Sequence, residues 1–89
     1  MNTKKIICQI IERILMYKED EIKIDKFLDD TLGLFSIIEN DSSQNFKKDF
    51  HSFWDIIEEY FATETHDNYQ KNIMEEILPG FLESMKKYI

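Results

Sequence analysis

The sequence predicts an all-α fold, a compact antiparallel bundle of four helices in which residues 1–89 form a single domain. Hydrophobic residues make up 43% of the 89 residues, and the chain has only two glycines and one proline to interrupt helices. Apolar residues recur at the three- and four-residue spacing of helices and not at the two-residue spacing of strands. The polar runs between the periodic segments are short, as the loops of a bundle are.

The first periodic segment predicts a helix from about Thr3 to Lys18. Its apolar residues fall on one stripe: Ile6, Ile7, Ile10, Ile11, Ile14 and Leu15. Isoleucine has only moderate helix propensity, so we expect this helix to depend on burying the stripe against its neighbours. Cys8 lies within the apolar stretch, and we expect it to be a small buried residue. The charged run from Lys18 to Glu21 is the predicted first turn.

The second helix is predicted from about Lys23 to Ile38, with apolar residues at Ile24, Phe27, Leu28, Leu32, Phe35 and Ile38. Gly33 in its interior costs about 1 kcal/mol relative to alanine, and we expect another helix to pack closely there. The polar loop that follows contains a predicted N-cap at Asp41, because Asp41 precedes Gln44 by the spacing of a capping box.

The third helix is predicted from about Gln44 to Ala62 and is expected to supply much of the core through Phe46, Phe50, Phe53, Trp54, Ile57, Tyr60 and Phe61. A fourth helix is predicted from near Asn68 to near Tyr88, with apolar residues at Tyr69, Ile73, Ile77, Phe81, Leu82 and Met85. Pro79 lacks a backbone donor and clashes with the preceding turn, so this helix is expected to kink or split near Leu78.

Charge is distributed unevenly along the chain. The net charge is −7, the first eighteen residues are net positive, and Lys71 is the single cation among many acids from Asp49 to Glu83. Such a field repels nucleic acids and anionic lipids and attracts basic proteins. We therefore expect a basic protein partner, without direct binding of nucleic acid or of a membrane.

The candidate partner-binding residues lie on and after the third helix. Acidic side chains are expected to supply the charge, and Tyr60 is expected to be the apolar anchor, because tyrosine joins a large ring to a hydrogen-bonding tip. The acids are Asp55, Glu58, Glu59, Glu64 and Asp67. In the competing interpretation these acids form an ordinary solvated helix face that improves solubility, and Tyr60 is a core residue whose hydroxyl reaches water.

No complete catalytic or metal-binding constellation is present in the sequence. His51 stands one helical turn before Asp55 but has no further ligands in the pattern, and Cys8 lies among isoleucines without a base. We therefore expect no enzyme activity, no metal and no cofactor. A single cysteine fits a reducing cytoplasm. Glu12 and Arg13 interrupt the apolar start, so neither a signal peptide nor a membrane span is expected.

The stretch from Glu19 to Phe35 follows a short apolar helix and places Ile22, Phe27 and Leu28 in a helical rhythm. It resembles the helix, acidic turn and helix that open the small immunity proteins of the colicin type and of contact-dependent growth inhibition. The resemblance covers about the first forty residues. It implies a bacterial, cytoplasmic protein that binds a cognate toxin domain, often a basic nuclease acting on tRNA or other RNA, and blocks its active site or substrate path.

Two other functions fit the same sequence. One is a structural or regulatory helical subunit that homo-oligomerises through exposed apolar positions. The other is a nucleic-acid-mimicking inhibitor of a phage-defence or DNA-binding protein, which would use the same electrostatics against another target. The sequence leaves the oligomeric state open.

Overall fold

The computed structural model describes residues 2–63 and 73–89, and every regular element within those two ranges is helical. The elements are α1 (Thr3–Lys18), α2 (Ile24–Ile38), the 3-10 turn η1 (Glu39–Asp41), α3 (Gln44–Thr63), the π-helical turn η2 (Ile73–Ile77) and α5 (Leu78–Lys86). The predicted all-α fold is confirmed over these residues. The predicted start of the last helix near Asn68, and Tyr69 with it, lie outside the described residues.

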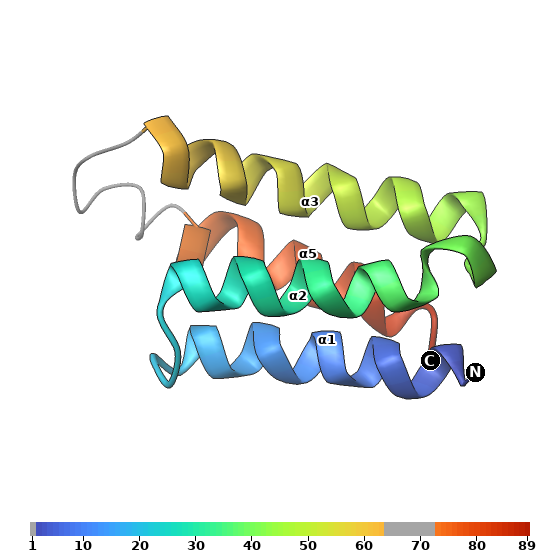
Figure 1. The fold of residues 1–89 in the computed structure, drawn as a ribbon. Helices are drawn as coiled ribbons and strands as arrows, with labels where there is room; N and C mark the ends of the chain where they lie inside the picture. Colours follow the sequence, from blue (N-terminus) through green and yellow to red (C-terminus); the bar gives the residue numbers. More distant parts are fainter. Residues whose placement is uncertain (1, 64–72) are drawn as a thin grey trace.

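The helices run alternately up and down, so that both ends of the chain and the start of α3 lie at one end of the bundle (Figure 1). Helix α1 packs closely against α2 and α5, and α3 packs against α5, whereas the backbones of α2 and α3 lie farther apart with large side chains between them. The boundary between α2 and α3, called the seam below, is therefore filled by side chains and not by closely approaching backbones.

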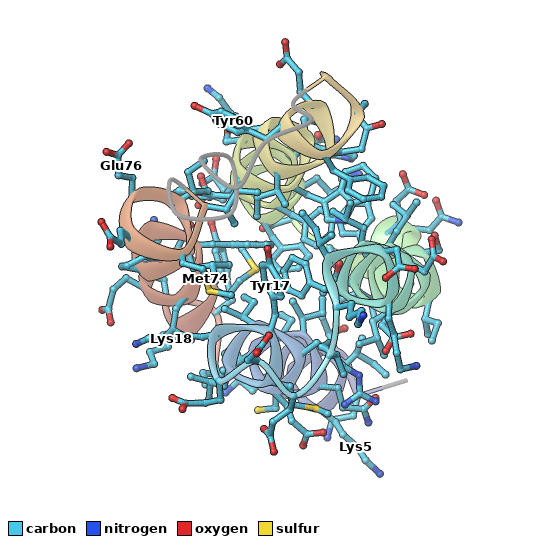
Figure 2. All side chains as sticks on the ribbon, turned by 90° about the vertical axis from the view of Figure 1, so that its left-hand side faces the viewer. Lys5, Tyr17, Lys18, Tyr60, Met74 and Glu76 are labelled. Atoms are coloured by element: carbon cyan, nitrogen blue, oxygen red, sulfur yellow. The ribbon has the colours of Figure 1, made fainter. Side chains whose placement is uncertain are left out.

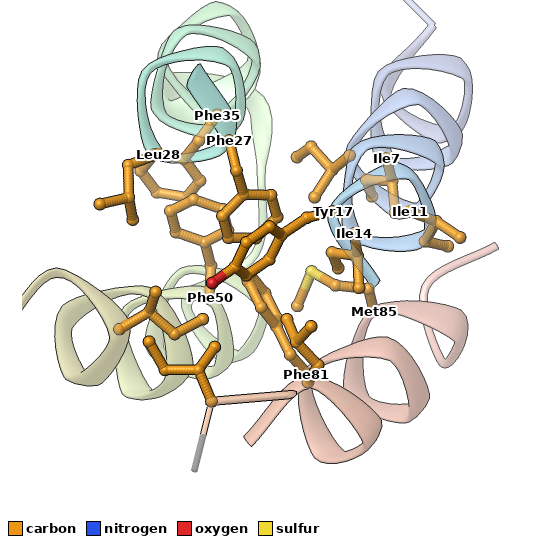
Figure 3. Close-up of a cluster of buried hydrophobic side chains, with 14 of the residues drawn as sticks. Ile7, Ile11, Ile14, Tyr17, Phe27, Leu28, Phe35, Phe50, Phe81 and Met85 are labelled. Atoms are coloured by element: carbon orange, nitrogen blue, oxygen red, sulfur yellow. The ribbon is translucent and has the colours of Figure 1, made fainter. Parts of the chain in front are cut away.

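Phe50 of α3 lies at the centre of the core. Its fully buried ring stacks on Phe35 of α2 with the centroids 4.2 Å apart and meets Phe81 of α5 edge-on at 5.7 Å. Tyr17 of α1 stacks on Phe27 of α2 at 4.8 Å. Figure 3 shows these rings packed against the isoleucine stripe of α1. Aromatic pairs of this kind add about 0.5–1.5 kcal/mol each beyond the area they bury.

The turn between α1 and α2 is a Schellman motif with aspartate at the position that usually holds glycine. The Asp20 N–H donates to the Tyr17 carbonyl at 3.0 Å and the Glu21 N–H donates to the Met16 carbonyl at 2.8 Å, while Asp20 has a φ of 63°. Aspartate is one of the few residues that tolerate this left-handed conformation. The turn thus ends α1 and also places an acid at this end of the bundle.

The predicted N-cap at Asp41 is wrong. Helix α3 begins at Gln44, and the Ser43 hydroxyl accepts from the Phe46 N–H at 3.1 Å. Asp41 lies in η1 and is too early in the chain to cap α3. Because serine and aspartate are about equally good caps, the sequence alone could not separate them.

Several residues expected in the core are exposed. Cys8 is exposed, as are Leu15, Leu32 and Phe61. Cys8 and Leu15 lie about 100° or more around α1 from the centre of its buried stripe, so α2 and α5 do not cover them. Leu32 of α2 and Phe61 of α3 line one surface groove at the seam, and in the described part of the chain no third helix lines that groove.

The two glycines have opposite surroundings. A Cβ atom added at Gly33 would meet nothing within 4 Å, so the expected close packing at Gly33 is wrong. A Cβ atom at Gly80 would lie 2.9 Å from Cε1 of Phe53, whose ring stacks on Phe81.

Gly80 follows Pro79 in the first turn of α5, where proline's missing N–H is not needed. The change from η2 to α5 at Leu78 agrees with the expected break.

Substitution of each glycine by alanine tests this difference. Gly33→Ala should raise the free energy of unfolding by about 1 kcal/mol, because alanine has the higher helix propensity and meets open space. Gly80→Ala should lower it by about 1 kcal/mol, because the Phe53 ring must leave its stacked position. Urea unfolding followed by circular dichroism measures both values. Equal stabilisation by the two substitutions would contradict the packing of Phe53 on Gly80.

A hydrogen bond ties the end of the chain to α3. The Tyr88 hydroxyl donates to Oδ2 of Asp49 at 2.5 Å, and Nζ of Lys87 lies 3.3 Å from the same oxygen. The bond to Tyr88 is the main cause that lowers the pKa of Asp49 below 3.8, with Lys87 acting in the same direction. The same bond raises the pKa of Tyr88 to about 12.

Tyr88→Phe should lower the free energy of unfolding by about 1 kcal/mol near neutral pH, because it removes a hydrogen bond to a charged acceptor. The folded-state pKa of Asp49 is depressed, so this difference should shrink as the pH falls below about 4 and Asp49 is protonated. The pKa of Tyr88 is raised, so the difference should also shrink as the pH rises from about 10 to 12. Denaturant unfolding across this pH range measures it. A difference that does not change with pH would contradict the bond.

Candidate protein-binding groove between α2 and α3

A hydrogen-bonded tryptophan joins α3 to α2 across the seam. Nε1 of Trp54 donates to Oγ1 of Thr31 at 3.1 Å and to the Leu28 carbonyl at 3.3 Å. The fully buried Thr31 hydroxyl donates its own hydrogen to the Phe27 carbonyl at 2.7 Å, so a lone pair remains to accept from the indole. The indole therefore spans the seam and satisfies a buried hydroxyl.

Beside Trp54 the seam opens into a surface groove with a volume of about 260 Å³. Its lining residues come from α2 (Asp25, Leu28, Asp29 and Leu32) and from α3 (Trp54, Glu58 and Phe61). Their spacing of three and four residues puts them on one face of each helix. Leu32 is 38% exposed and Phe61 is 42% exposed, so apolar surface of both helices is open to solvent in the groove.

Carboxylates stand on both walls of the groove. Asp25 and Asp29 on α2 and Glu58 on α3 are all exposed, and no cation of the described residues lies within ion-pair distance of them. The neighbouring Asp30 differs, because its Oδ2 lies 3.2 Å from Nε of Arg13 and 3.3 Å from Nζ of Lys26. The three acids that face the groove are therefore not neutralised, although exposed acids elsewhere, such as Glu21 and Glu76, also have no cation within ion-pair distance among the described residues.

The structure distributes the sequence-predicted site residues over more than one surface. Of those that the structure describes, Glu58 alone lines the groove. Asp55 is exposed and its Oδ1 lies 3.2 Å from Nδ1 of His51, and Glu59 is exposed one residue beyond Glu58. Tyr60 is half-buried on the side of α3 that faces away from α2 (Figure 2). The remaining two, Glu64 and Asp67, lie outside the described residues.

The α2 wall of the groove was missed by sequence reasoning. Asp25 and Asp29 are not among the predicted partner-binding residues, and Leu32 was predicted as part of the apolar stripe of the second helix. The available signal was the four-residue spacing that sets Asp25 and Asp29 alongside Leu28 and Leu32 on one helix face. This spacing predicts a groove only if α3 is known to border the same face of α2.

Charge is also polarised along the bundle. Lysine pairs stand near the start of α1 (Lys4 and Lys5), near the start of α3 (Lys47 and Lys48) and at the end of α5 (Lys86 and Lys87), and the antiparallel course brings all three pairs to one end. Acids gather at the other end, in the α1–α2 turn, the start of α2, the last turns of α3 and η2. The groove opens between α2 and α3 on the acidic half of the molecule.

Within residues 2–63 and 73–89, no group of three or more potential ligands is placed to hold a metal ion. In the same residues, no helix has the length and apolar character needed to cross a membrane. Comparison with protein families, with curated proteins and with solved structures found no match to this chain.

Trp54→Phe should lower the free energy of unfolding by at least about 1 kcal/mol, because the hydrogen bonds to Thr31 and Leu28 are lost and the smaller phenyl ring fills less space than the indole. Thr31→Val removes the acceptor from the other side. If the indole and the hydroxyl form one bridge, the double variant should be less destabilised than the sum of the single variants. Urea unfolding of the four proteins measures the coupling, and additive effects would contradict the bridge.

Proposed function

We propose that this protein is a stoichiometric inhibitor of a basic protein, specifically an immunity protein that neutralises a cognate nuclease toxin domain. The groove between α2 and α3 carries the proposal, because it combines exposed apolar side chains with carboxylates that have no neighbouring cation in the described residues. Leu32 and Phe61 expose apolar surface within one groove that also carries acids, and an apolar patch with a polar rim is typical of a protein interaction site.

Electrostatics supports a basic partner. A nuclease must present positive charge to its phosphate substrate, so an anionic surface can occupy the same site. The net charge of −7 attracts such a partner at a distance, and the polarised bundle turns its acidic end toward the approaching positive surface. Fast, oriented capture is the advantage that such charge complementarity provides.

The apolar residues of the groove would set the lifetime of the complex. Exposed charge pairs at the rim of an interface mainly change the association rate, whereas buried aromatic and aliphatic anchors slow dissociation. Phe61 and Leu32 are large side chains that already lie at the surface, and Trp54 lines the same groove. Of these residues, Trp54 belongs to a type that is enriched among binding hot spots.

The rival functions differ in what they require of this surface. A homo-oligomer formed groove to groove would bring Asp25, Asp29 and Glu58 of two copies together, and like charges disfavour that arrangement. Sedimentation velocity distinguishes it, because a stable dimer without any partner would favour the subunit function. A nucleic-acid mimic would bind a DNA-binding or phage-defence protein through the same acids and would leave a ribonuclease toxin active.

The direct test uses a basic toxin domain encoded beside this chain. We expect a one-to-one complex by titration calorimetry and a loss of toxicity on co-expression. Binding should weaken as salt is raised, because exposed charges are screened. The absence of both a complex and protection would overturn the proposed function.

Glu58→Lys should slow association with the toxin domain by about tenfold at low ionic strength, because it reverses a charge in the groove. Glu76→Lys makes the same change in net charge on the side of the bundle that faces away from α2 (Figure 2), and it should slow association less. Stopped-flow kinetics at two salt concentrations measures both rates. If the two variants slow association equally, the association rate depends only on net charge, and a specific role of the groove is contradicted.

A further inference from the structure

We infer that the groove between α2 and α3 binds an amphipathic helix of the partner protein, one whose narrow apolar stripe is flanked on both sides by lysine or arginine. The inferred helix rests on the proposed function, because it would be the part of the basic partner protein that enters the groove.

The polar groups of the groove favour a helix over an extended segment. Among the described residues that line it, the only side-chain donor is the Trp54 indole N–H, which is already bonded to Thr31 and Leu28. The remaining polar side chains are carboxylates, which accept but do not donate. An extended segment would therefore leave its carbonyl groups without partners over the apolar floor, whereas a helix satisfies them internally.

The length of the groove matches two turns of a helix. Asp25 and Leu32 are seven residues apart on α2, a rise of about 10 Å. A bound helix presents apolar side chains at positions i, i+3 or i+4, and i+7 over the same length. Leu32 and Phe61, from opposite walls, supply the apolar surface that this stripe would cover.

The carboxylates set the flanks of the bound helix. Asp25 and Asp29 line the α2 wall and Glu58 lines the α3 wall, so cations are needed on both sides of the apolar stripe. Lysine and arginine suit these positions, because their long stems can lie along apolar surface while the charged ends reach the acids. A partner with cations on one side only would leave one wall uncompensated.

The probe is a synthetic helical peptide of about 18 residues, made of leucine, alanine and lysine, with leucines on one narrow stripe and lysines on both sides. Calorimetry measures its affinity for the intact protein and for four variants that each add one negative charge. Leu32→Glu and Phe61→Glu change the groove. Ile37→Glu on α2 and Ile56→Glu on α3 are matched controls, because both are exposed apolar residues outside the groove lining.

We expect Leu32→Glu and Phe61→Glu to weaken peptide binding roughly tenfold, which corresponds to about 1.4 kcal/mol. The two controls should leave the affinity unchanged or raise it slightly, because they only add attraction for a cation. Equal strengthening by all four variants would show that charge alone acts, and it would overturn the inference. Equal affinity for a peptide with the same composition but scattered leucines would also overturn it. Thermal unfolding of each variant confirms that it is folded.

The same variants separate this inference from the proposed function. If the toxin domain binds the wild type and the groove variants equally well, the helix in the groove is wrong while the inhibitor function stands. If the peptide binds in the groove but no toxin domain is bound or neutralised, the groove inference stands and the proposed function is wrong.

Discussion

The packing of Phe50 determines where the other helices lie. Its ring is stacked on Phe35 and in edge contact with Phe81, so a single side chain of α3 positions both α2 and α5. One helical turn later, Trp54 lies in a stacked orientation to Phe50, with the ring centroids 6.4 Å apart. This placement brings the indole N–H to the buried Thr31 hydroxyl of α2. The core and the hydrogen bond across the seam therefore depend on two aromatic residues of α3, Phe50 and Trp54.

The groove lies beside the part of α3 that follows Phe50 and Trp54. Near the middle of α3, the rings of Phe50 and Trp54 fill the space beside α2, but two turns later Phe61 is exposed and lines the groove with Leu32. Exposing large apolar side chains gives up about 25 cal/mol for every Å² left uncovered. A partner that covers Leu32 and Phe61 would recover part of that free energy. The carboxylates beside them would then favour positively charged partners over neutral or negatively charged ones.

Local features of the fold could be predicted from the sequence, and features that depend on two distant segments could not. The bounds of α1, α2 and α3 follow from hydrophobic periodicity, which each segment carries by itself. Periodicity identifies the apolar face of a helix but not the neighbour that covers it, so the exposure of Leu32 and Phe61 was not foreseen. The difference between Asp29 and Asp30 depends on Arg13 from another helix. The role of Gly80 likewise depends on Phe53, which is far away in the chain.

The position of Trp54 also gives the protein an optical property. It is the only tryptophan of the chain, and one part of its ring borders the groove while its N–H is bonded inside the bundle. Indole emission shifts to shorter wavelength when water is removed from the ring. A molecule seated between α2 and α3 would therefore change the intrinsic fluorescence, and one bound on the α5 side would leave it unchanged. The fluorescence of Trp54 thus reports, without any added label, whether the groove is occupied.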